Sequence, residues 1–235
     1  MDALNTVLQG PLPWLVLTLG AFALADRLSV AAGRHPLANP VLIAVIVVAT
    51  VLLLGATPYA TYMKGAQYIT LLLGPATVAL ALPLRDNLPL IRQAALPIIA
   101  ALVAGSFTAA ITAIGLGTWM GLDFTTIASL APKSATSPVA IGIAERIGGL
   151  PTLAAVLAIS TGMIGAITVT PLMSGLRIRD RRARGFAAGV AAHGIGTARA
   201  FQVNPTSGAF AALGMGLNAL LTPLVAAWIL GWLPW

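Results

Sequence analysis

Cysteine is absent from this 235-residue sequence, and charged residues make up only 8% of it. Without cysteine the chain can form no disulfide framework, use no thiol nucleophile and hold no cysteine-ligated cluster. An ordinary soluble domain is about a quarter charged, so too few charges remain here to cover a surface that faces water. The HExxH and GxSxG motifs of zinc and serine hydrolases and any His/Cys cluster are also missing. These absences argue against an enzyme and against a metal site.

Apolar residues dominate what is present, because hydrophobic residues form 58% of the chain and the mean hydropathy is +0.94. A spanning helix needs about 20 mostly apolar residues. Candidate spans lie at 12–32, 41–57, 67–83, 94–116, 150–173 and 208–233, and two further apolar segments, 122–147 and 185–202, are interrupted by Gly, Pro, Ser, Thr and a charge. We therefore predict an all-α polytopic membrane protein with about six spanning helices, forming a single domain over 1–235. Its expected parts are scaffold helices (12–93), a core with the interrupted segments (94–202) and the last span (208–233).

The basic residues are distributed like a topology signal rather than like a nucleic-acid-binding surface. Five of the thirteen lie in one short run, namely Arg177, Arg179, Arg181, Arg182 and Arg184. Positively charged loops face the cytoplasm. This run and the basic loops at 26–40 and 84–93 all face the cytoplasm if 122–147 is a re-entrant hairpin, and 185–202 is then a second hairpin that enters from the opposite side. The alternative is that both segments are broken helices that cross the membrane, and charge counting does not separate the two.

A weak internal repeat points to a transporter architecture. The motif LPxxAA occurs at 96–101 and again at 150–155, and Ser106 and Ser160 follow at the same offset. Each copy is a span followed by an interrupted segment, and in the topology above the two copies run in opposite directions. Inverted repeats with broken helices at their interface are typical of secondary transporters.

The first interruption, PKSATSP at 132–138, has the composition of an anion site. Ser137 is a good N-cap and Pro138 suits the first helical position, so a half-helix is expected to begin there. The free N–H groups and the positive dipole end of such a helix attract anions. The side chains expected around this point are Lys133, Ser134, Thr136 and Ser137. The alternative is that Lys133 extends to the membrane interface and the prolines only kink a helix.

The second interruption, HGIGTARA at 193–200, combines four features of a binding site. Gly194 and Gly196 give backbone freedom, and Thr197 is a candidate helix cap. Arg199 supplies a cation and His193 a titratable group. Arg199 can hold a carboxylate through two N–H groups. His193 titrates near neutral pH and could carry a coupled proton. The alternatives are that Arg199 is a structural cation paired with Glu145 or Asp123, and that His193 is a hydrogen-bonded core residue.

Three further features are weaker candidates. GPAT at 74–77 interrupts the third span, most simply as a proline kink. The last span contains glycines, which suit close helix packing. Asn218 lies among them and is the polar group there that could face a solute. Glu145 stands next to Arg146, as in a surface ion pair. Thr77 and Glu145 are candidates for ion coupling or for a structural role.

Four stretches of the sequence resemble the LrgB/CidB family of antiholin-like membrane proteins, whose relatives include the plastid glycolate/glycerate translocator. They are GPATVALALPL (74–84), PKSATSPVAIGIAERIGG (132–149), ARGFAAGVAAHGIGTARAF (183–201) and GAFAALGMGLNALLTPLVA (208–226), in order over roughly residues 40–230. The resemblance implies transport of small monocarboxylates such as glycolate, glycerate, lactate or pyruvate. It also implies a smaller membrane partner of the LrgA/CidA type, and it carries a second assignment to the control of murein hydrolases and lysis.

The residue patterns and the resemblance together predict a secondary transporter of small monocarboxylates in the inner (cytoplasmic) membrane. We expect an elevator-like homodimer that needs no cofactor, couples to protons or sodium ions and binds no nucleic acid. The half-helix starts at Ser137 and Thr197 would hold the carboxylate, with charge from Lys133 and Arg199, while Asn218 and the hydroxyls would contact a substrate hydroxyl. The alternative function is a holin/antiholin-type regulator of murein hydrolase activity and cell lysis.

Overall fold

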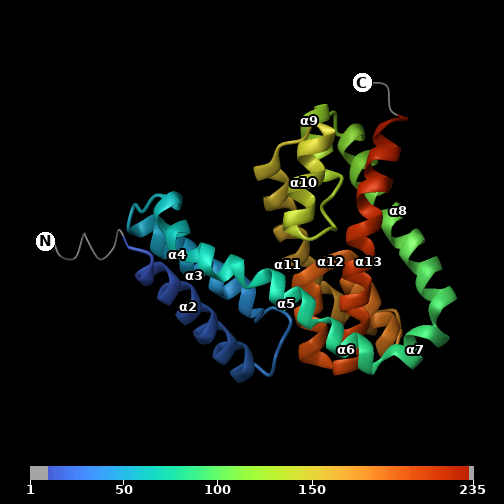
Figure 1. Ribbon diagram of the computed structural model, residues 1–235, viewed down its shortest axis with the longest axis horizontal. Coiled ribbons are helices and arrows are strands. Elements are labelled where there is room, and N and C mark those ends of the chain that lie inside the picture. Colours follow the sequence, from blue (N-terminus) through green and yellow to red (C-terminus); the bar gives the residue numbers. More distant parts are fainter. Residues whose placement is uncertain (1–9, 233–235) are drawn as a thin grey trace, which may run out of the picture. The chain divides into compact units, whose positions relative to one another are not determined.

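The computed structural model describes residues 10–232, apart from the side chain of Thr77. The chain divides into two compact units, with the boundary between Ala81 and Leu82 (Figure 1). All regular structure within the described residues is helical, which confirms the predicted all-α class. The predicted single domain over 1–235 stays a prediction.

The first unit contains α2 (Leu12–Ala31), α3 (Pro40–Leu54), α4 (Tyr59–Leu71) and α5 (Leu73–Ala79). Helix α2 packs against α3 and α4. The approach to α4 is closest at Gly65, where a Cβ would lie 2.3 Å from the carbonyl oxygen of Pro11, so only glycine fits there. Elsewhere the unit exposes apolar side chains, such as Leu53 at 80% and Leu54 at 84%. Apolar residues exposed to this extent suit contact with lipid.

Five helical stretches of the described chain are long and apolar enough to cross a membrane: Leu12–Ala31, Tyr59–Asp86, Ala95–Trp119, Pro151–Gly175 and Pro205–Leu230. Helix α3 is also apolar, but it has 15 residues and is about 22 Å long, shorter than a hydrocarbon core of about 30 Å. The prediction of about six spans thus corresponds to five full-length stretches and one short helix.

The GPAT motif lies in the third of the predicted spans. Helix α4 ends at Leu71 and α5 begins at Leu73, so the helix breaks just ahead of Pro75. A proline is tolerated in the first turn of a helix, where its missing N–H would have no partner, but not in the interior. The motif therefore starts a helix as well as interrupting the segment.

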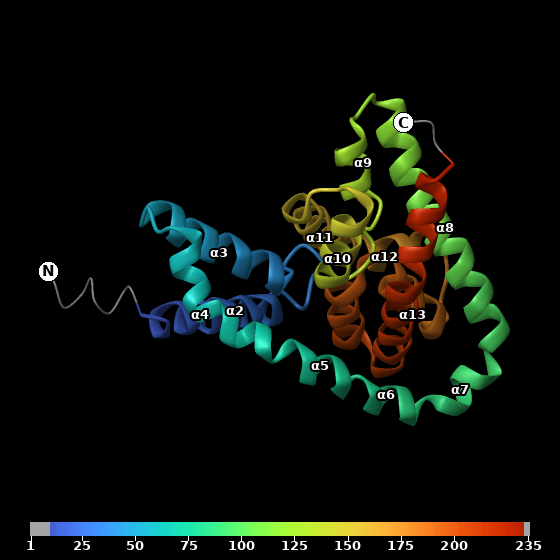
Figure 2. The same ribbon diagram turned by 45° about the horizontal axis from the view of Figure 1, so that its top comes forward.

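The second unit begins within α6 (Ala81–Asp86) and contains α7 (Leu88–Gln93), α8 (Ala95–Trp119), α9 (Phe124–Leu130), α10 (Ser137–Ile147), α11 (Pro151–Gly175), α12 (Arg181–Val203) and α13 (Pro205–Leu230). Helices α8 and α13 run in the same direction, because Ile98 packs with Phe210 near their starts and Ile114 packs with Ala226 near their ends (Figures 1 and 2). Helix α11 runs in the opposite direction, since Val169 near its end packs beside Ala211.

Helices α9 and α10 form a hairpin with a turn at residues 131–136. Helix α10 ends at Gly148, whose φ of 84° is left-handed and suits glycine. A Cβ on Gly148 would lie 3.1 Å from the ring of Phe124, so the end of α10 lies against the start of α9. Ile127 of α9 shares a buried cluster with Ala226. The open end of this hairpin therefore lies at the C-terminal end of α13.

Helix α12 also folds back on itself. Its backbone leaves the helical region at Ala192 (φ −128°, ψ 16°) and His193 (φ 39°, ψ −130°). In a straight helix, residues 188 and 196 would be about 12 Å apart along the axis. Instead, a Cβ on Gly196 would lie 2.5 Å from the carbonyl oxygen of Ala188. The result is two antiparallel arms, residues 181–191 and 194–203.

The first arm of α12 runs parallel to α13 in direct backbone contact. A Cβ on Gly185 would lie 2.0 Å from the carbonyl oxygen of Ser207, and one on Gly189 would lie 1.9 Å from that of Ala211. Both pairs are spaced by four residues, so small residues of the two helices face each other turn by turn. This is the close packing typical of GxxxG helix pairs.

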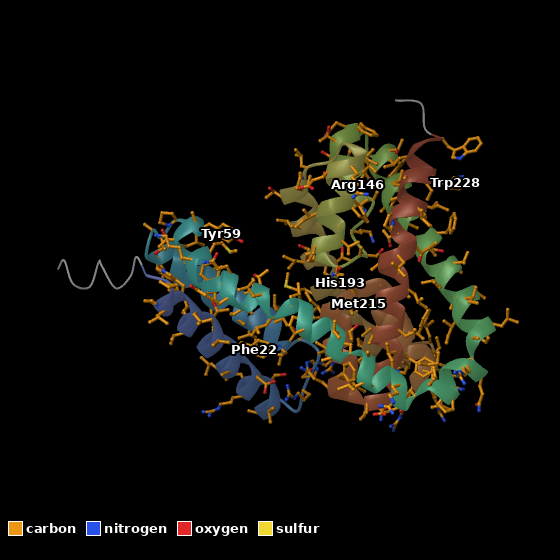
Figure 3. All side chains as sticks on the ribbon, viewed as in Figure 1. Phe22, Tyr59, Arg146, His193, Met215 and Trp228 are labelled. Atoms are coloured by element: carbon orange, nitrogen blue, oxygen red, sulfur yellow. The ribbon has the colours of Figure 1, made fainter. Side chains whose placement is uncertain are left out.

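The second arm of α12 returns antiparallel to α13. Thr197 lies 3.9 Å from the sulfur of Met215, while Phe201, farther from the break, lies against Gly208. Figure 3 shows His193 and Met215 midway along the unit, with Arg146 and Trp228 at one end. The open end of the α12 hairpin thus lies at the N-terminal end of α13. The two hairpins approach the middle of α13 from opposite ends, and their re-entry into a membrane stays a prediction.

Candidate functional site

The tips of the two hairpins meet at Asn218, which is 1% exposed and lies midway along α13. Its Nδ2 donates to the carbonyl oxygen of Ser134 at 3.0 Å, in the turn between α9 and α10. The same nitrogen donates to the carbonyl oxygen of Val190 at 3.1 Å, just before the break in α12. Its Oδ1 accepts from Ser106 Oγ of α8 at 2.6 Å. Because carbonyl oxygens only accept, this network fixes the orientation of the amide.

Ala158 of α11 makes a second link between the tips. Its carbonyl oxygen lies 2.8 Å from His193 Nε2, and its side chain packs with Ala135 and Ala140 of the first hairpin. The carbonyl can only accept, so Nε2 carries the proton and Nδ1 is the basic nitrogen of the neutral ring. A Cβ on Gly162 would lie 2.6 Å from Cε1 of His193, so only glycine leaves room for the imidazole.

The backbone of His193 has positive φ, in a region that residues with a Cβ rarely adopt. Such a conformation costs about 1–3 kcal/mol and persists where the surroundings impose it, often at functional sites. Here the surroundings include Ala158, which holds the ring, and Thr197, whose Oγ1 donates to the His193 carbonyl oxygen at 2.8 Å.

The start of α10 differs by one residue from the prediction. Thr136, with extended φ and ψ of −62° and 148°, is the N-cap, and Ser137 is already helical. The predicted N-cap at Ser137 was therefore wrong. The Thr136 side chain makes no capping hydrogen bond, so the first N–H groups of α10 have no side-chain cap. Lys133, half-buried, lies in the same turn.

Thr197 does not cap the second arm of α12, which corrects another prediction. The arm begins at Gly194, directly after the non-helical His193, so Thr197 lies inside its first turn. Instead, the Thr197 hydroxyl donates a hydrogen bond to the carbonyl oxygen of His193, four residues earlier, and so stabilises the break. Gly194 is exposed, whereas Gly196 is buried where the two arms touch. The non-helical backbone that was predicted at the two glycines thus occurs at His193. Gly196 instead allows the second arm to pack closely against Ala188 of the first arm.

Arg199 lies away from the tips, contrary to the prediction that it and Lys133 supply charge to the same carboxylate. It lines a cavity of about 310 Å³ at the open end of the α12 hairpin, together with other arginines. The proposed pairing with Glu145 or Asp123 is also wrong, since both lie at the other end of α13, where α10 ends and α9 begins. The sequence predicted a hairpin over 185–202 but not the position of its turn, and the turn at His193 carries Arg199 along the second arm, away from the tip.

The remaining candidates are peripheral. Glu145 is exposed near the end of α10, and the side chain of Thr77 lies outside the described residues. Asp123 caps α9, and hydrogen bonds from Thr126 lower the pKa of its carboxyl. No group of three or more His, Cys, Asp or Glu residues within the described part of the chain could hold a metal ion.

The sequence prediction missed the contribution of α11. Its buried residues are small and recur every fourth position, at Ala154, Ala158, Gly162 and Ala166. This periodicity is visible in the sequence and indicates a helix face against which another backbone packs. It marks the face that receives the break in α12.

Comparisons with known proteins agree with the resemblance. The model of the LrgB-like family matches residues 18–232. The uncharacterized protein YwbG of Bacillus subtilis is 35% identical over 195 residues, 83% of this chain and 87% of that protein. Holin-like protein CidB of Staphylococcus epidermidis is 34% identical over 82% of this chain and 84% of its own length. Holin-like protein CidB of Staphylococcus aureus is 32% identical over 90% of this chain and 92% of its own length. No solved structure matches. The chain therefore belongs to the LrgB-like family and is a multi-pass protein of the cell membrane.

Proposed function

We propose that this protein carries small carboxylates across the cell membrane and binds them where the hairpin tips meet. The observation that supports this most is that two interruptions, approaching from opposite ends of α13, are joined by Asn218 and Ala158. Hydrocarbon cannot satisfy the polar groups of an interrupted helix, so such breaks occur where they are buried in protein or line a wet site. Paired breaks near the midplane are typical of secondary transporters.

The first hairpin supplies the groups suited to a carboxylate. The uncapped N–H groups at the start of α10 and the positive end of its dipole attract an anion. Lys133 in the same turn adds one positive charge, which matches the single charge of a monocarboxylate. The hydroxyls of Thr136 and Ser137 stand at the same helix start and are suited to a substrate hydroxyl.

The second hairpin supplies shape and a titratable group. Because Nε2 of His193 donates its proton to the carbonyl oxygen of Ala158, Nδ1 is the nitrogen available to take up a coupled proton. The exposed Gly194 begins the second arm beside it. Asn218 donates both amide hydrogens to backbone carbonyls, so we assign it the task of positioning the tips rather than contacting substrate.

The lengths of the hairpin arms suit re-entrant segments. Helices α9 and α10 have 7 and 11 residues, about 10 and 16 Å, and a hydrocarbon core is about 30 Å thick. Helices α8 and α11 have 25 residues each, run in opposite directions and are each followed by a hairpin, as an inverted repeat requires. The arginine run at 177–184 lies at the N-terminal end of α13, which we assign to the cytoplasm.

Ligand-dependent thermal unfolding in detergent tests the binding step. A carrier should be stabilised by its substrate, by about 2.7 kcal/mol at a hundredfold excess over Kd. We expect glycolate, glycerate, lactate or pyruvate to raise the unfolding midpoint of the wild type, and uncharged glycerol to have no effect. The shift should disappear in Lys133→Gln. Equal shifts in wild type and Lys133→Gln would remove the carboxylate from this turn.

A second function, of a holin-like kind, is supported by the names of the Staphylococcus relatives, which favour it more directly than they favour transport. It would require assembly in the membrane, with a smaller partner of the LrgA/CidA type, and solute release without a selective site. Release of a trapped dye from liposomes, with and without that partner, separates the two functions. Dye release that is insensitive to Lys133→Gln would favour the holin-like function, whereas a carrier retains the dye.

A further inference from the structure

A basic cavity lies at the open end of the α12 hairpin, where the end of α11, both ends of α12 and the start of α13 meet. Its volume is about 310 Å³. Four arginines line it, namely Arg179, Arg181, Arg184 and Arg199, together with the polar residues Thr170, Asn204 and Ser207. No Asp or Glu is among the described residues that line it. We call this cavity the arginine pocket.

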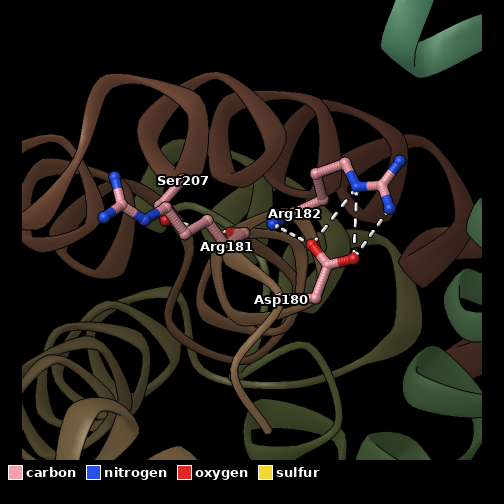
Figure 4. A network of polar contacts seen from close by, with 4 residues as sticks. All are labelled: Asp180, Arg181, Arg182 and Ser207. Carbon is pink, nitrogen blue, oxygen red and sulfur yellow. Dashed lines mark hydrogen bonds and ion pairs between the residues drawn. The ribbon is translucent and has the colours of Figure 1, made fainter.

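Two consecutive arginines at the start of α12 have different partners. Asp180 accepts a hydrogen bond from the backbone N–H of Arg182 and forms an ion pair with its guanidinium, both at 2.8 Å. Figure 4 shows the Arg181 guanidinium on the other side, near Ser207, whose Oγ donates to the Arg181 carbonyl oxygen at 2.9 Å. The carboxylate of Asp180 thus pairs with Arg182, whereas Arg181 lines the arginine pocket.

Arg184 and Arg199 give the pocket fixed walls. One nitrogen of Arg184, Nη2, donates to the carbonyl oxygen of Thr170 and to Ser174 Oγ, each at 3.0 Å, so the guanidinium is held against α11. Arg199, on the second arm of α12, is only 7% exposed. The pocket therefore holds cations from both arms of one hairpin, at least one of them largely removed from water.

The charge of the pocket selects the class of ligand. Like charges around one cavity repel each other, and a bound anion offsets that repulsion. A monocarboxylate carries one negative charge, whereas a phosphate monoester carries nearly two and presents three strong acceptor oxygens. The planar guanidinium fork matches phosphate oxygens. We propose that the arginine pocket binds a phosphate group, carried either by a small phosphorylated solute or by the headgroup of an anionic lipid.

Binding there would act on the hairpin as a whole. A phosphate that contacts Arg181 on the first arm and Arg199 on the second would bridge the two ends of α12 and hold the hairpin closed. The break at His193 lies at the other end of the same hairpin. The pocket is separate from the hairpin tips, so this inference does not rest on the proposed transport function.

Binding measurements on the purified full-length protein test the proposal in two arms. In detergent, inorganic phosphate and glycerol 3-phosphate serve as free probes, and in phosphatidylcholine nanodiscs, phosphatidic acid serves as the lipid probe. We expect saturable binding in at least one arm, weakened about tenfold or more in Arg181→Gln and less in Arg181→Lys, which keeps the charge but loses the fork. The arm that responds identifies the source of the phosphate.

Arg146→Gln is the matched control, because it removes one exposed arginine charge at the opposite end of the unit. It should bind like the wild type. Arg181 is exposed, so its variants should fold, and their unfolding midpoints check this. No saturable binding in either arm, or Arg181→Gln binding as tightly as the wild type, would overturn the proposal.

Discussion

Asn218 Nδ2 lies 3.0 Å from the carbonyl oxygen of Ser134, and this bond ties the middle of α13 to the turn of the first hairpin. The same nitrogen donates to Val190 beside the break in α12. One buried amide thus fixes where the two interruptions stand relative to each other. A carbonyl oxygen that is buried without a donor lowers the stability of the fold by about 1–3 kcal/mol. The carbonyl oxygens of Ser134 and Val190 therefore require a side chain with two N–H groups at position 218.

The first prediction concerns this amide. Asn218→Asp keeps the shape and can still accept from Ser106, but it places oxygen against the carbonyl oxygens of Ser134 and Val190. We expect a loss of about 3 kcal/mol or more of stability, seen as a lower thermal midpoint in detergent. Ser106→Ala removes only the donor to Asn218 Oδ1 and should cost about 1–3 kcal/mol, less than Asn218→Asp. If the two variants unfold at the same temperature, Asn218 does not hold the tips.

The second prediction concerns the space beside His193. An alanine at position 162 would place its Cβ 2.6 Å from the imidazole, so Gly162→Ala should displace the ring. We expect a loss of about 1–3 kcal/mol of stability and a strong loss of carboxylate binding. Gly115→Ala is the matched control, because nothing lies within 4 Å of its Cβ. Alanine there should be neutral or stabilising by up to about 1 kcal/mol. Wild-type binding by Gly162→Ala would contradict the arrangement.

The third prediction separates the backbone of His193 from its ring. His193→Gly and His193→Ala both lose the imidazole and its bond to Ala158, but only glycine adopts a φ of 39° without strain. His193→Gly should therefore be more stable than His193→Ala by about 1 kcal/mol or more. Both should lose the pH dependence of uptake if His193 carries the coupled proton. Equal stability of the two would show that the break is not strained.

The fourth prediction concerns the direction of the hairpins. The chain has no native cysteine, so single cysteines report position without background. Asp180 and Glu145 are both exposed, at opposite ends of the second unit. In intact cells, an impermeant maleimide should label Glu145→Cys and spare Asp180→Cys, which should react only after lysis. Labelling of both from outside would mean that the two hairpins enter from one face.

Much of the second unit follows from local chemistry that the sequence displays. The interruptions were predicted from Pro132–Pro138 and from the glycines after His193, because these residues decide backbone conformation within a turn or two. The cap of α10 fell one residue from its predicted place, since Thr136 and Ser137 are both good caps and the choice depends on the turn that precedes them.

The tertiary partners of the breaks could not be predicted in the same way. Ala158 contributes a backbone carbonyl and Gly162 contributes empty space. Their four-residue spacing marks a packing face in the sequence, but it does not show which backbone packs against that face. Arg199 was placed at the tip because it follows His193 closely along the chain. It reaches the opposite end of the hairpin because the second arm runs back toward Arg181, a reversal that depends on packing along α13.

The most direct test of the account is uptake of labelled glycolate into liposomes that contain the purified protein alone. We compare the wild type with Lys133→Gln, and with Lys64→Gln, which removes the other lysine of the chain, in α4 of the first unit. If the carboxylate binds at the hairpin tips, uptake is saturable, is competed by unlabelled glycerate or lactate, falls about tenfold or more in Lys133→Gln and is retained in Lys64→Gln. Folded wild type that accumulates no more than empty liposomes, or Lys133→Gln that transports as well as the wild type, would contradict it.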